Sequence, residues 1–327
     1  MKIFITGGSG FVGGAAIKKL AATQQIIAMS RSPASDTKIL SLGATPLRSQ
    51  LGFVKPADMK GFDIVIHAAA HIGPWGTRRQ YWQTNVEGTA QLIKAAKEAG
   101  VKRFIHIGTE SGCFYGQDMY SIDETYPLSI SSPYFYSETK AEAERQVLAA
   151  NDPEHNFLTL SLRPRFIWGP GDQTILPELV KAVEKGQFMW ISGGHAVTSS
   201  TNIHNLCHAI ELALEKGVGA EAYFIVDEKD HSFRELLTEL LATQSLKPSD
   251  KSIPGWIVRG LAVLVEAIWT LFPIKADPPI TRFAAALMSK ECSIRSEKAC
   301  DCLGYTPVVS MQDGYDELSK LYKSATS

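Results

Sequence analysis

The sequence is short of several features that indicate other classes of protein. Its 33 basic and 34 acidic residues almost cancel over 327 residues, and it has neither a run of Lys or Arg nor an alternation of basic with aromatic residues. A nucleic-acid partner, which needs concentrated positive charge, is therefore not expected. The chain also lacks internal repeats and low-complexity linkers, so neither a solenoid nor a disordered spacer is indicated.

Cysteine and metal-ligand patterns are equally sparse. The five cysteines form an odd number without a C-x-x-C pair, which favours reduced thiols in a cytoplasmic enzyme over a disulfide framework or a zinc site. The histidines show no metal-ligand spacing, so no metal is expected. The first predicted strand begins at Lys2, which leaves no room for a secretory leader and predicts that the protein is not exported by that route.

Residues 253–273 form the most apolar stretch of the chain. A transmembrane span needs about 20 nearly uncharged residues, whereas Arg259 and Glu266 interrupt this stretch on one helical face. We therefore favour a lid or wall of an apolar pocket. A peripheral membrane contact, which would make the protein membrane-associated, stays open as an alternative.

Strand-like and helix-like segments alternate along the first half of the chain. Strands are expected over 2–6, 26–30, 44–47, 62–67, 103–107 and 158–163, and helices over 10–22, 81–99 and 134–150. This alternation predicts an α/β fold, a Rossmann-type doubly wound parallel sheet. We expect residues 1–165 to form a dinucleotide-binding domain to which residues 200–230 return. Residues 166–327 would then form mainly a smaller, interleaved substrate-binding lobe.

A phosphate cradle is predicted at the start of the chain, where an apolar strand runs into a glycine-rich turn and a helix. Gly7 allows a tight turn, Gly10 removes a side chain that would keep a pyrophosphate from the backbone, and Gly13 lets the helix lie against the strand. The N–H groups of Phe11 and Val12 belong to the helix N-terminus, which attracts phosphate. A dinucleotide is therefore the expected ligand.

Acid–base chemistry is indicated by Tyr136 and Lys140, which lie one helical turn apart on the same face. A free phenol titrates near ~10, so a neighbouring cation is needed to make it a useful proton shuttle. Ser111, near the end of the preceding predicted strand, is the candidate donor to a substrate oxygen, with Thr109 in reserve.

These features together resemble the extended short-chain dehydrogenase/reductase superfamily. The resemblance implies that Tyr136 is the acid/base, that Lys140 lowers its pKa and holds ribose hydroxyls, and that Ser111 orients the substrate. It further implies that Asn85 ties the helix backbone into the proton network. The motifs that carry it are the 6–13 turn, 63–70, 85–89, Ser111 before Tyr115-Gly116, Tyr136-x-x-x-Lys140, and Arg163-Pro164 before 169–172.

Cofactor choice depends on the residues that end the second predicted strand. That strand ends without an acid and is followed by Arg31 and Ser32, which favours NADP(H), although NAD(H) stays possible. Asp36 lies too far into the next segment to replace the missing acid. Gln50 and Leu51 stand where many relatives carry Asp-Leu. Further positions expected to line the cofactor are Ala68, Ala69, Ala70, Pro164, Phe166 and Ile167.

A bulky hydrophobic substrate is expected. Phe166 stands where the sugar-nucleotide epimerases and dehydratases of this superfamily carry Asn, and an aromatic ring cannot replace the hydrogen bonds of that amide. Segments 75–76, 167–172, 278–283 and 303–307 resemble the 3β-hydroxysteroid dehydrogenase branch, near sterol dehydrogenase-like enzymes and 2-alkyl-3-oxoalkanoate reductases. The resemblance implies NAD(P)-dependent interconversion of a secondary alcohol and a ketone on a steroid-like or long-alkyl skeleton.

Two other functions stay open at this point. The first is a nucleotide-sugar epimerase or dehydratase that keeps NAD tightly bound. The second is a non-catalytic redox-sensing or scaffolding protein on the same fold. For any of them the resemblance implies a homodimer formed through the helices over 81–99 and 134–150.

Overall fold

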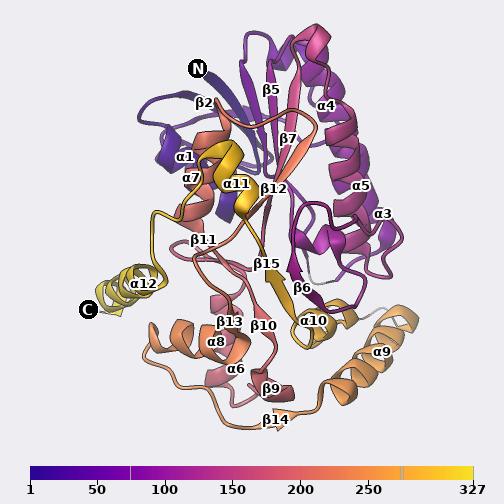
Figure 1. Ribbon diagram of the computed structural model, residues 1–327, viewed down its shortest axis with the longest axis vertical. Helices are drawn as coiled ribbons and strands as arrows, with labels where there is room; N and C mark the ends of the chain where they lie inside the picture. Colours follow the sequence, from indigo (N-terminus) through magenta and orange to yellow (C-terminus); the bar gives the residue numbers. More distant parts are fainter. Residues whose placement is uncertain (74, 273, 275, 327) are drawn as a thin grey trace.

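The largest layer of the molecule is a parallel sheet of seven strands. The computed structural model describes residues 1–73, 75–272, 274 and 276–326. The strands stand in the order β12-β7-β5-β4-β1-β2-β3 (Figure 1). Their bounds are β1 (Lys2–Thr6), β2 (Gln25–Ser30), β3 (Thr45–Arg48), β4 (Ile64–His67), β5 (Arg103–Ile107), β7 (Leu158–Pro164) and β12 (Glu221–Ile225).

Helices cover both faces of this sheet because its strands are apolar on both sides. Side chains alternate across a strand, so Ile3 and Ile5 of β1 pack in one core and Phe4 in the other. The first core lies under α1 (Phe11–Leu20), α2 (Pro33–Ser41) and α7 (Ile203–Ala213), and the second under α4 (Gly88–Glu98) and α5 (Phe135–Ala149).

The strand order creates a switch point beside β1. The chain runs outward from β1 to β2 and β3, and then returns to the other side of β1 with β4 and β5. In a doubly wound sheet a ligand binds in the crevice outside the carboxyl ends of the strands at this point. The predicted Rossmann-type fold is confirmed.

Two crossovers differ from the sequence prediction. The helix α2 was not predicted because it is short and buries only Ile39, although Ser32 caps it and Pro33 occupies its first turn. The helix expected over 81–99 is divided into α3 (Arg78–Tyr81), the π-helical segment η2 (Trp82–Glu87) and α4. The wide turn of η2 turns Asn85 inward, where it is buried.

The second lobe is built on a small sheet in the order β13-β10-β15-β6. Its strands are β6 (Met119–Ile122), β10 (Val197–Thr198), β13 (His231–Ser232) and β15 (Cys292–Ile294). The helices of this lobe are α6 (Leu176–Glu184), α8 (Phe233–Ala242), α9 (Gly255–Leu271), α10 (Arg282–Leu287) and α12 (Met311–Thr326). The remaining helix of this half, α11 (Glu297–Leu303), packs instead on the first core of the large sheet through Ala299 and Leu303. Short pairs join β8 (Ile167–Trp168) to β11 (Thr201–Asn202), and β9 (Trp190–Ile191) to β14 (Ser252–Ile253).

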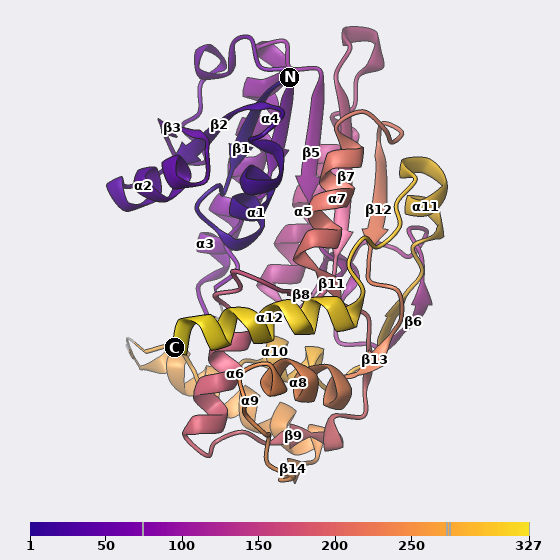
Figure 2. The same cartoon turned by 90° about the vertical axis from the view of Figure 1, so that its left-hand side faces the viewer.

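The two halves of the chain are interleaved. Within residues 200–230, which the sequence predicts to return to the first domain, β12 pairs with β7 in the main sheet. In the other direction, β6 pairs with β15 in the small sheet. Figure 2 shows α12 crossing between the large sheet and the helices α6 and α8. The division between residues 165 and 166 stays a prediction.

Cysteine and metal ligands add little to the fold. All five cysteines are free thiols, of which Cys113, Cys207 and Cys292 are buried. Within the described ranges, no group of three or more His, Cys, Asp or Glu side chains is placed to hold a metal ion.

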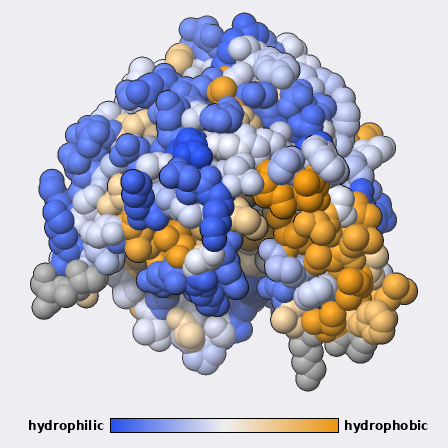
Figure 3. All heavy atoms as spheres, turned by 90° about the horizontal axis from the view of Figure 1, so that it is seen from below, coloured by the Kyte–Doolittle hydropathy of each residue, from blue (hydrophilic) through white to orange (hydrophobic). Residues whose placement is uncertain are grey.

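The apolar stretch at 253–273 forms β14 and α9, except Pro273, which lies outside the described residues. Val258 and Ala262 of α9 are buried, whereas Trp256, Leu264 and Leu271 are exposed. Figure 3 shows apolar side chains gathered on this side of the lobe. Neither α9 nor any other helix in the described part of the chain is long and apolar enough to cross a bilayer.

Replacing Gly13 should destabilise the large sheet. A Cβ at Gly13 would lie 2.3 Å from the Gly7 carbonyl oxygen, so Gly13→Ala forces helix α1 away from β1. We expect the free energy of unfolding to fall by about 1–3 kcal/mol, measured by urea denaturation. The matched control is Gly260→Ala in α9, where a Cβ meets nothing within 4 Å. It should raise stability by about 0.5–1 kcal/mol, and equal effects of the two variants would contradict this packing argument.

Candidate active site

The glycine-rich turn forms the predicted cradle beside the switch point. Gly7 has a φ of +73°, and its carbonyl oxygen accepts a 2.9 Å hydrogen bond from the Gly10 amide. Gly10 is the N-cap residue of α1, and within the described residues no side chain caps that helix. The first N–H groups of α1, including those of Phe11 and Val12, are thus available to a phosphate. A Cβ at Gly7 would lie 2.8 Å from the Ala69 amide nitrogen, so only glycine lets this turn lie against the end of β4. The turn and the uncapped amides of α1 fit the phosphates of a dinucleotide.

Small residues line the neighbouring strand end. Ala68, Ala69 and Ala70 follow β4 and are half-buried. The Ala69 amide donates a 3.1 Å hydrogen bond to the Thr6 hydroxyl at the end of β1. This bond joins the ends of the two strands across the switch point and fixes the floor of the predicted cofactor site.

Arg31 and Gln50 follow the ends of the adjacent strands β2 and β3, and their predicted contacts with the cofactor stay predictions. The Ser49 amide donates to the Ser30 carbonyl at 3.0 Å, which keeps the ends of β2 and β3 together. Arg31 is exposed, and no partner for its side chain is found within the part of the chain that the structure describes. The Ser32 hydroxyl caps α2 by accepting from the Ser35 amide at 3.2 Å.

A second arginine at this edge, Arg48, was not predicted from the sequence as a site residue. Arg48, at the end of β3, forms an ion pair with Asp36 of α2. Asp36 is thereby engaged, which agrees with its exclusion as an acceptor for the ribose. Leu51 packs against the core under α4 and α5, and the cofactor contact predicted for it stays a prediction.

Tyr136 lies on the first turn of α5 and is half-buried against α10. Its ring centroid is 5.6 Å from that of Phe283. Burial raises the pKa of the Tyr136 phenol, the negative charge of Glu110 raises it further, and a hydrogen bond with Thr109 acts in the opposite direction. The expectation that Lys140 lowers the pKa of this phenol is not met in this structure, since the nearby charge that acts on it is the carboxylate.

The reason lies in the position of the Lys140 ammonium. Its Nζ donates to the carbonyl oxygen of Ile107 at 2.7 Å and lies 3.1 Å from His106 Nε2. Burial lowers the pKa of Lys140 to about 8, and the charge of Glu144 partly opposes this shift. The ammonium is therefore held under the end of β5, one helical turn from the phenol.

Two buried histidines extend this polar layer. His67 Nδ1 lies 2.7 Å from the Thr6 hydroxyl and His67 Nε2 lies 2.9 Å from the Thr89 hydroxyl. Burial, together with the charge of Lys140, lowers the pKa of His67 to about 3 and the pKa of His106 well below its usual value. Both imidazoles are neutral at physiological pH, in keeping with a structural role.

Asn85 connects the loop after β4 to α5. Its Oδ1 accepts from the His71 amide at 2.7 Å, and its Nδ2 donates to the His71 carbonyl at 3.2 Å and to Thr139 Oγ1 at 3.1 Å. The Thr139 hydroxyl in turn donates to the Phe135 carbonyl at 2.6 Å. Asn85 thus positions the first turn of α5, which carries Tyr136.

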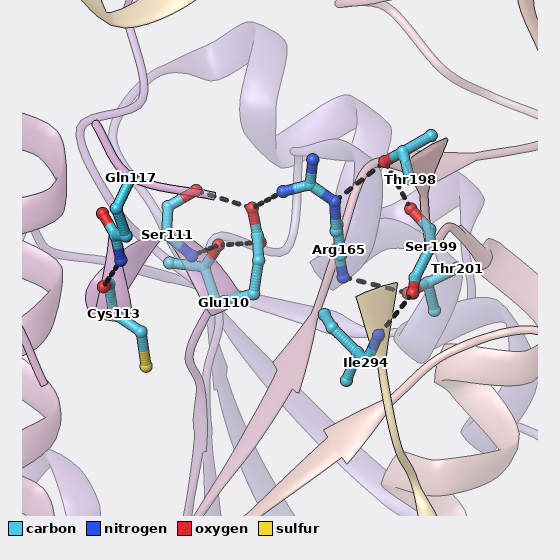
Figure 4. A network of polar contacts seen from close by, with 10 residues as sticks. Glu110, Ser111, Cys113, Gln117, Arg165, Thr198, Ser199, Thr201 and Ile294 are labelled. Carbon is cyan, nitrogen blue, oxygen red and sulfur yellow. Dashed lines mark hydrogen bonds and ion pairs between the residues drawn. The ribbon is translucent and has the colours of Figure 1, made fainter. Parts of the chain in front are cut away.

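Ser111 lies in η3 (Glu110–Cys113), directly after β5, with its side chain buried. Its hydroxyl donates to Glu110 Oε1 at 2.8 Å, and the Thr109 hydroxyl donates to Glu110 Oε2 at 2.8 Å. Arg165 Nη1 donates to Glu110 Oε1 at 2.6 Å (Figure 4). Sequence reasoning missed both members of this ion pair because they are 55 residues apart and belong to no local motif.

The segment after β7 is directed toward the second lobe. Phe166 has a φ of +41°, and its ring centroid lies 5.8 Å from that of Phe233. Ile167 belongs to β8 and pairs with Thr201 of β11. The predicted cofactor contacts of Pro164, Phe166 and Ile167 stay predictions.

Comparison with known proteins agrees with this geometry. Residues 4–254 match the 3-beta hydroxysteroid dehydrogenase/isomerase family. A ketoreductase of Stigmatella aurantiaca, which acts on 4-hydroxy-2-methyl-3-oxo-4-farnesyl-3,4-dihydroquinoline-1-oxide, is 36% identical over 97% of this chain and 96% of its own. A 2-alkyl-3-oxoalkanoate reductase of Stenotrophomonas maltophilia is 33% identical over 97% of this chain and 98% of its own.

Solved structures of similar fold include sugar-nucleotide enzymes. The dTDP-glucose 4,6-dehydratase DesIV of Streptomyces venezuelae, solved with NAD bound, aligns with a TM-score of 0.77 over 99% of this chain and 97% of its own, at 21% identity. At that identity the likeness concerns the fold.

Removing the buried ammonium should stabilise the cofactor-free protein at neutral pH. The folded-state pKa of Lys140 lies below its ordinary value of 10.5, so the unfolded chain binds the extra proton between about pH 8 and 10.5 and stability rises with pH across that window. Below pH 8 the wild type carries the full cost of the buried charge. Lys140→Met should therefore raise the free energy of unfolding at pH 7, by at most about 3 kcal/mol.

Urea denaturation of both proteins at a series of pH values measures the difference. The stabilisation should shrink as pH rises from 8 to 10.5, because the wild-type lysine becomes neutral in the folded state. A difference that does not depend on pH would show that the Lys140 ammonium is not disfavoured by burial.

Proposed function

Because the chain belongs to the 3-beta hydroxysteroid dehydrogenase/isomerase family, we propose that it is an NAD(P)-dependent oxidoreductase that interconverts a secondary alcohol and a ketone on a bulky hydrophobic substrate. The observation that carries the proposal is the position of the Tyr136 phenol. It lies beside the hydroxyl of Thr109, at the carboxyl edge of the same sheet whose first turn forms the phosphate cradle.

Tyr136 is proposed as the proton donor and acceptor. A nicotinamide cofactor bound at the cradle would supply or accept the hydride. In reduction the phenol donates its proton to the carbonyl oxygen, and in oxidation the phenolate removes the proton of the hydroxyl. The raised pKa of Tyr136 keeps the phenol protonated at neutral pH, which favours the reductive direction.

Ser111 is proposed to hold the substrate oxygen. Its single hydroxyl hydrogen is directed to Glu110 in this structure, so the oxygen presents its lone pairs to the site. Donation to a substrate carbonyl requires the hydroxyl to rotate away from the carboxylate. Lys140, held at the end of β5, and Asn85, which positions α5, complete the proposed catalytic set.

The apolar surroundings of Tyr136 support a hydrophobic substrate. Phe283 of α10 packs against the rings of Tyr136, Tyr134 and Phe114, with centroid distances of 5.6, 5.6 and 6.3 Å. Helix α9 packs on α10, so the apolar stretch predicted from the sequence adjoins the site. A wall of this composition suits a long-alkyl or steroid-like skeleton better than a sugar nucleotide.

NADP(H) is the proposed cofactor. Arg31 is exposed at the end of β2 beside the N-terminus of α2, and both features favour a 2′-phosphate over a bare hydroxyl. Asp36, the acid in this region, is paired with Arg48.

Two assembly features are retained as proposals. The exposed side chains of α9 are suited to a peripheral contact with a membrane, and the outer faces of α4 and α5 to a homodimer.

The alternative of a sugar-nucleotide epimerase is supported by the shared fold. Phe166, which packs in an aromatic core, argues against a sugar site lined by an amide.

Loss of the phenol should abolish most of the turnover. A panel of long-chain and polycyclic ketones is assayed by NADPH absorbance, and Tyr136→Phe is compared with wild type on the best substrate. We expect kcat to fall about 10²–10⁴-fold, with NADPH binding unchanged because the ring remains. Near-normal turnover by the variant would remove Tyr136 as the acid. A wild type that reduces no ketone, but is stabilised by UDP and purifies with NAD, would instead support the epimerase alternative.

The cofactor preference should depend on Arg31. In Arg31→Ala, KM for NADPH should rise about 10–100-fold, since a charge-assisted contact to phosphate is worth roughly 1.5–3 kcal/mol. KM for NADH should change little. Lys38→Ala, which removes another cation of the α2 segment, is the control. Equal KM values for NADPH in wild type and Arg31→Ala would contradict the assignment.

A further inference from the structure

Glu110 and Arg165 form a deeply buried ion pair near the proposed site. Their exposed fractions are 3% and 1%. Glu110 lies three residues after the end of β5 and Arg165 directly follows β7, so the pair joins the ends of two adjacent strands. Arg165 is held on its other side, where Nε donates to the Thr198 hydroxyl at 2.9 Å (Figure 4). The carboxylate is therefore held by Arg165, which Thr198 anchors in turn, and by the two hydroxyls beside it in the chain.

Glu110 determines where two hydroxyl hydrogens point. A serine or threonine hydroxyl has one hydrogen to donate, and those of Thr109 and Ser111 both go to the Glu110 carboxylate, each over 2.8 Å. Thr109 Oγ1 also accepts from the Ser111 amide at 3.2 Å. With both hydrogens committed to Glu110, the Thr109 and Ser111 oxygens can only accept hydrogen bonds from groups in the site.

A gain in folding stability does not explain why this ion pair is buried. Removing two charges from water costs several kcal/mol for each ion, and well-packed apolar residues of similar volume are often equally stable or more so. A second ion pair, Arg163 with Glu144 at 2.5 Å, already joins β7 to α5 at similar burial. The Glu110–Arg165 pair differs in that its carboxylate also contacts both hydroxyls beside the phenol.

We propose that Glu110, held in place by Arg165, is a positioning residue that orients the hydroxyls of Thr109 and Ser111 so that the Tyr136 phenol is the proton donor of the site. The proposal rests on the ketone-reducing function proposed above. Glu110 acts through these hydroxyls and through its charge, and it transfers no proton itself.

The charge of Glu110 works in the same direction. After burial, it is the largest cause of the raised pKa of Tyr136. The other titratable groups around the phenol are Tyr81 of α3, which raises the pKa slightly, and Lys140 one turn along α5, whose ammonium is bound to the Ile107 carbonyl. Phe283 faces the ring from α10 and carries no charge. Neutralising Glu110 should therefore make the phenol more acidic.

The test compares Glu110→Gln with wild type over a range of pH, using the ketone that wild type reduces best. We expect kcat to fall about 10–100-fold, as a small misplacement of reacting groups can cost 10²-fold, with KM for the ketone and the Kd for NADPH little changed. The alkaline limb of the kcat profile should move to lower pH by about one unit, because loss of the anion lowers the phenol pKa. An unmoved limb would overturn the proposal, whatever the change in kcat.

The control for loss of a buried carboxylate is Asp227→Asn. Asp227 is buried and accepts hydrogen bonds from Trp168, Ser200, Asn202 and Asn205, but its charge is not among the causes that act on Tyr136. It should lower Tm and leave the alkaline limb in place. If the limb moves equally in this variant, the effect is a general consequence of destabilisation and the proposal is wrong.

A paired variant covers the case in which Glu110→Gln fails to fold because Arg165 is left without its partner. Glu110→Gln with Arg165→Met leaves no uncompensated charge and should fold with a Tm near that of wild type. It should show the same loss of kcat and the same shift of the limb. Wild-type values in the paired variant overturn the positioning role. A wild type inactive on every ketone instead overturns the function, which separates the two failures.

Discussion

The site depends on the way charged groups are buried at the carboxyl edge of the sheet. Two ion pairs, Arg163 with Glu144 and Arg165 with Glu110, lie almost completely out of water and join the end of β7 to α5 and to η3. Lys140 is buried without a carboxylate of its own and is held by a carbonyl oxygen and a neutral imidazole. Because an unpaired charge is expensive in such a layer, the positions of these side chains constrain one another closely, and the phenol of Tyr136 is placed by that arrangement.

In this arrangement the two charged residues near the Tyr136 phenol, Lys140 and Glu110, have different effects on its pKa. The sequence suggested that a lysine one turn away would make Tyr136 acidic. In the structure the lysine is bound to the Ile107 carbonyl at the end of β5, and the charge that acts on the phenol is the negative charge of Glu110. That charge keeps the proton on the phenol, which is the form that can donate it.

Much of the fold was predictable because its signals are local. The glycine turn, the apolar strands of the large sheet and the Tyr136–Lys140 spacing each lie within a few residues. The segments that were missed depend on long-range contacts: α2 buries only Ile39 of its own, and β6 finds its partner β15 about 170 residues later. The Glu110–Arg165 pair is of the same kind, since nothing near either residue indicates the other. The order of strands could be inferred, but the direction of a hydroxyl hydrogen could not.

The late return of β12 also bears on how the chain is made. When a ribosome has released only the first 165 residues, β7 has β5 on one side and nothing on the other, since β12 and the α7 helix come from beyond residue 200. An apolar strand with a free row of amide groups is a template for unwanted pairing. During synthesis the large sheet therefore has an exposed edge at β7. That edge is covered by β12 only after about sixty further residues have emerged.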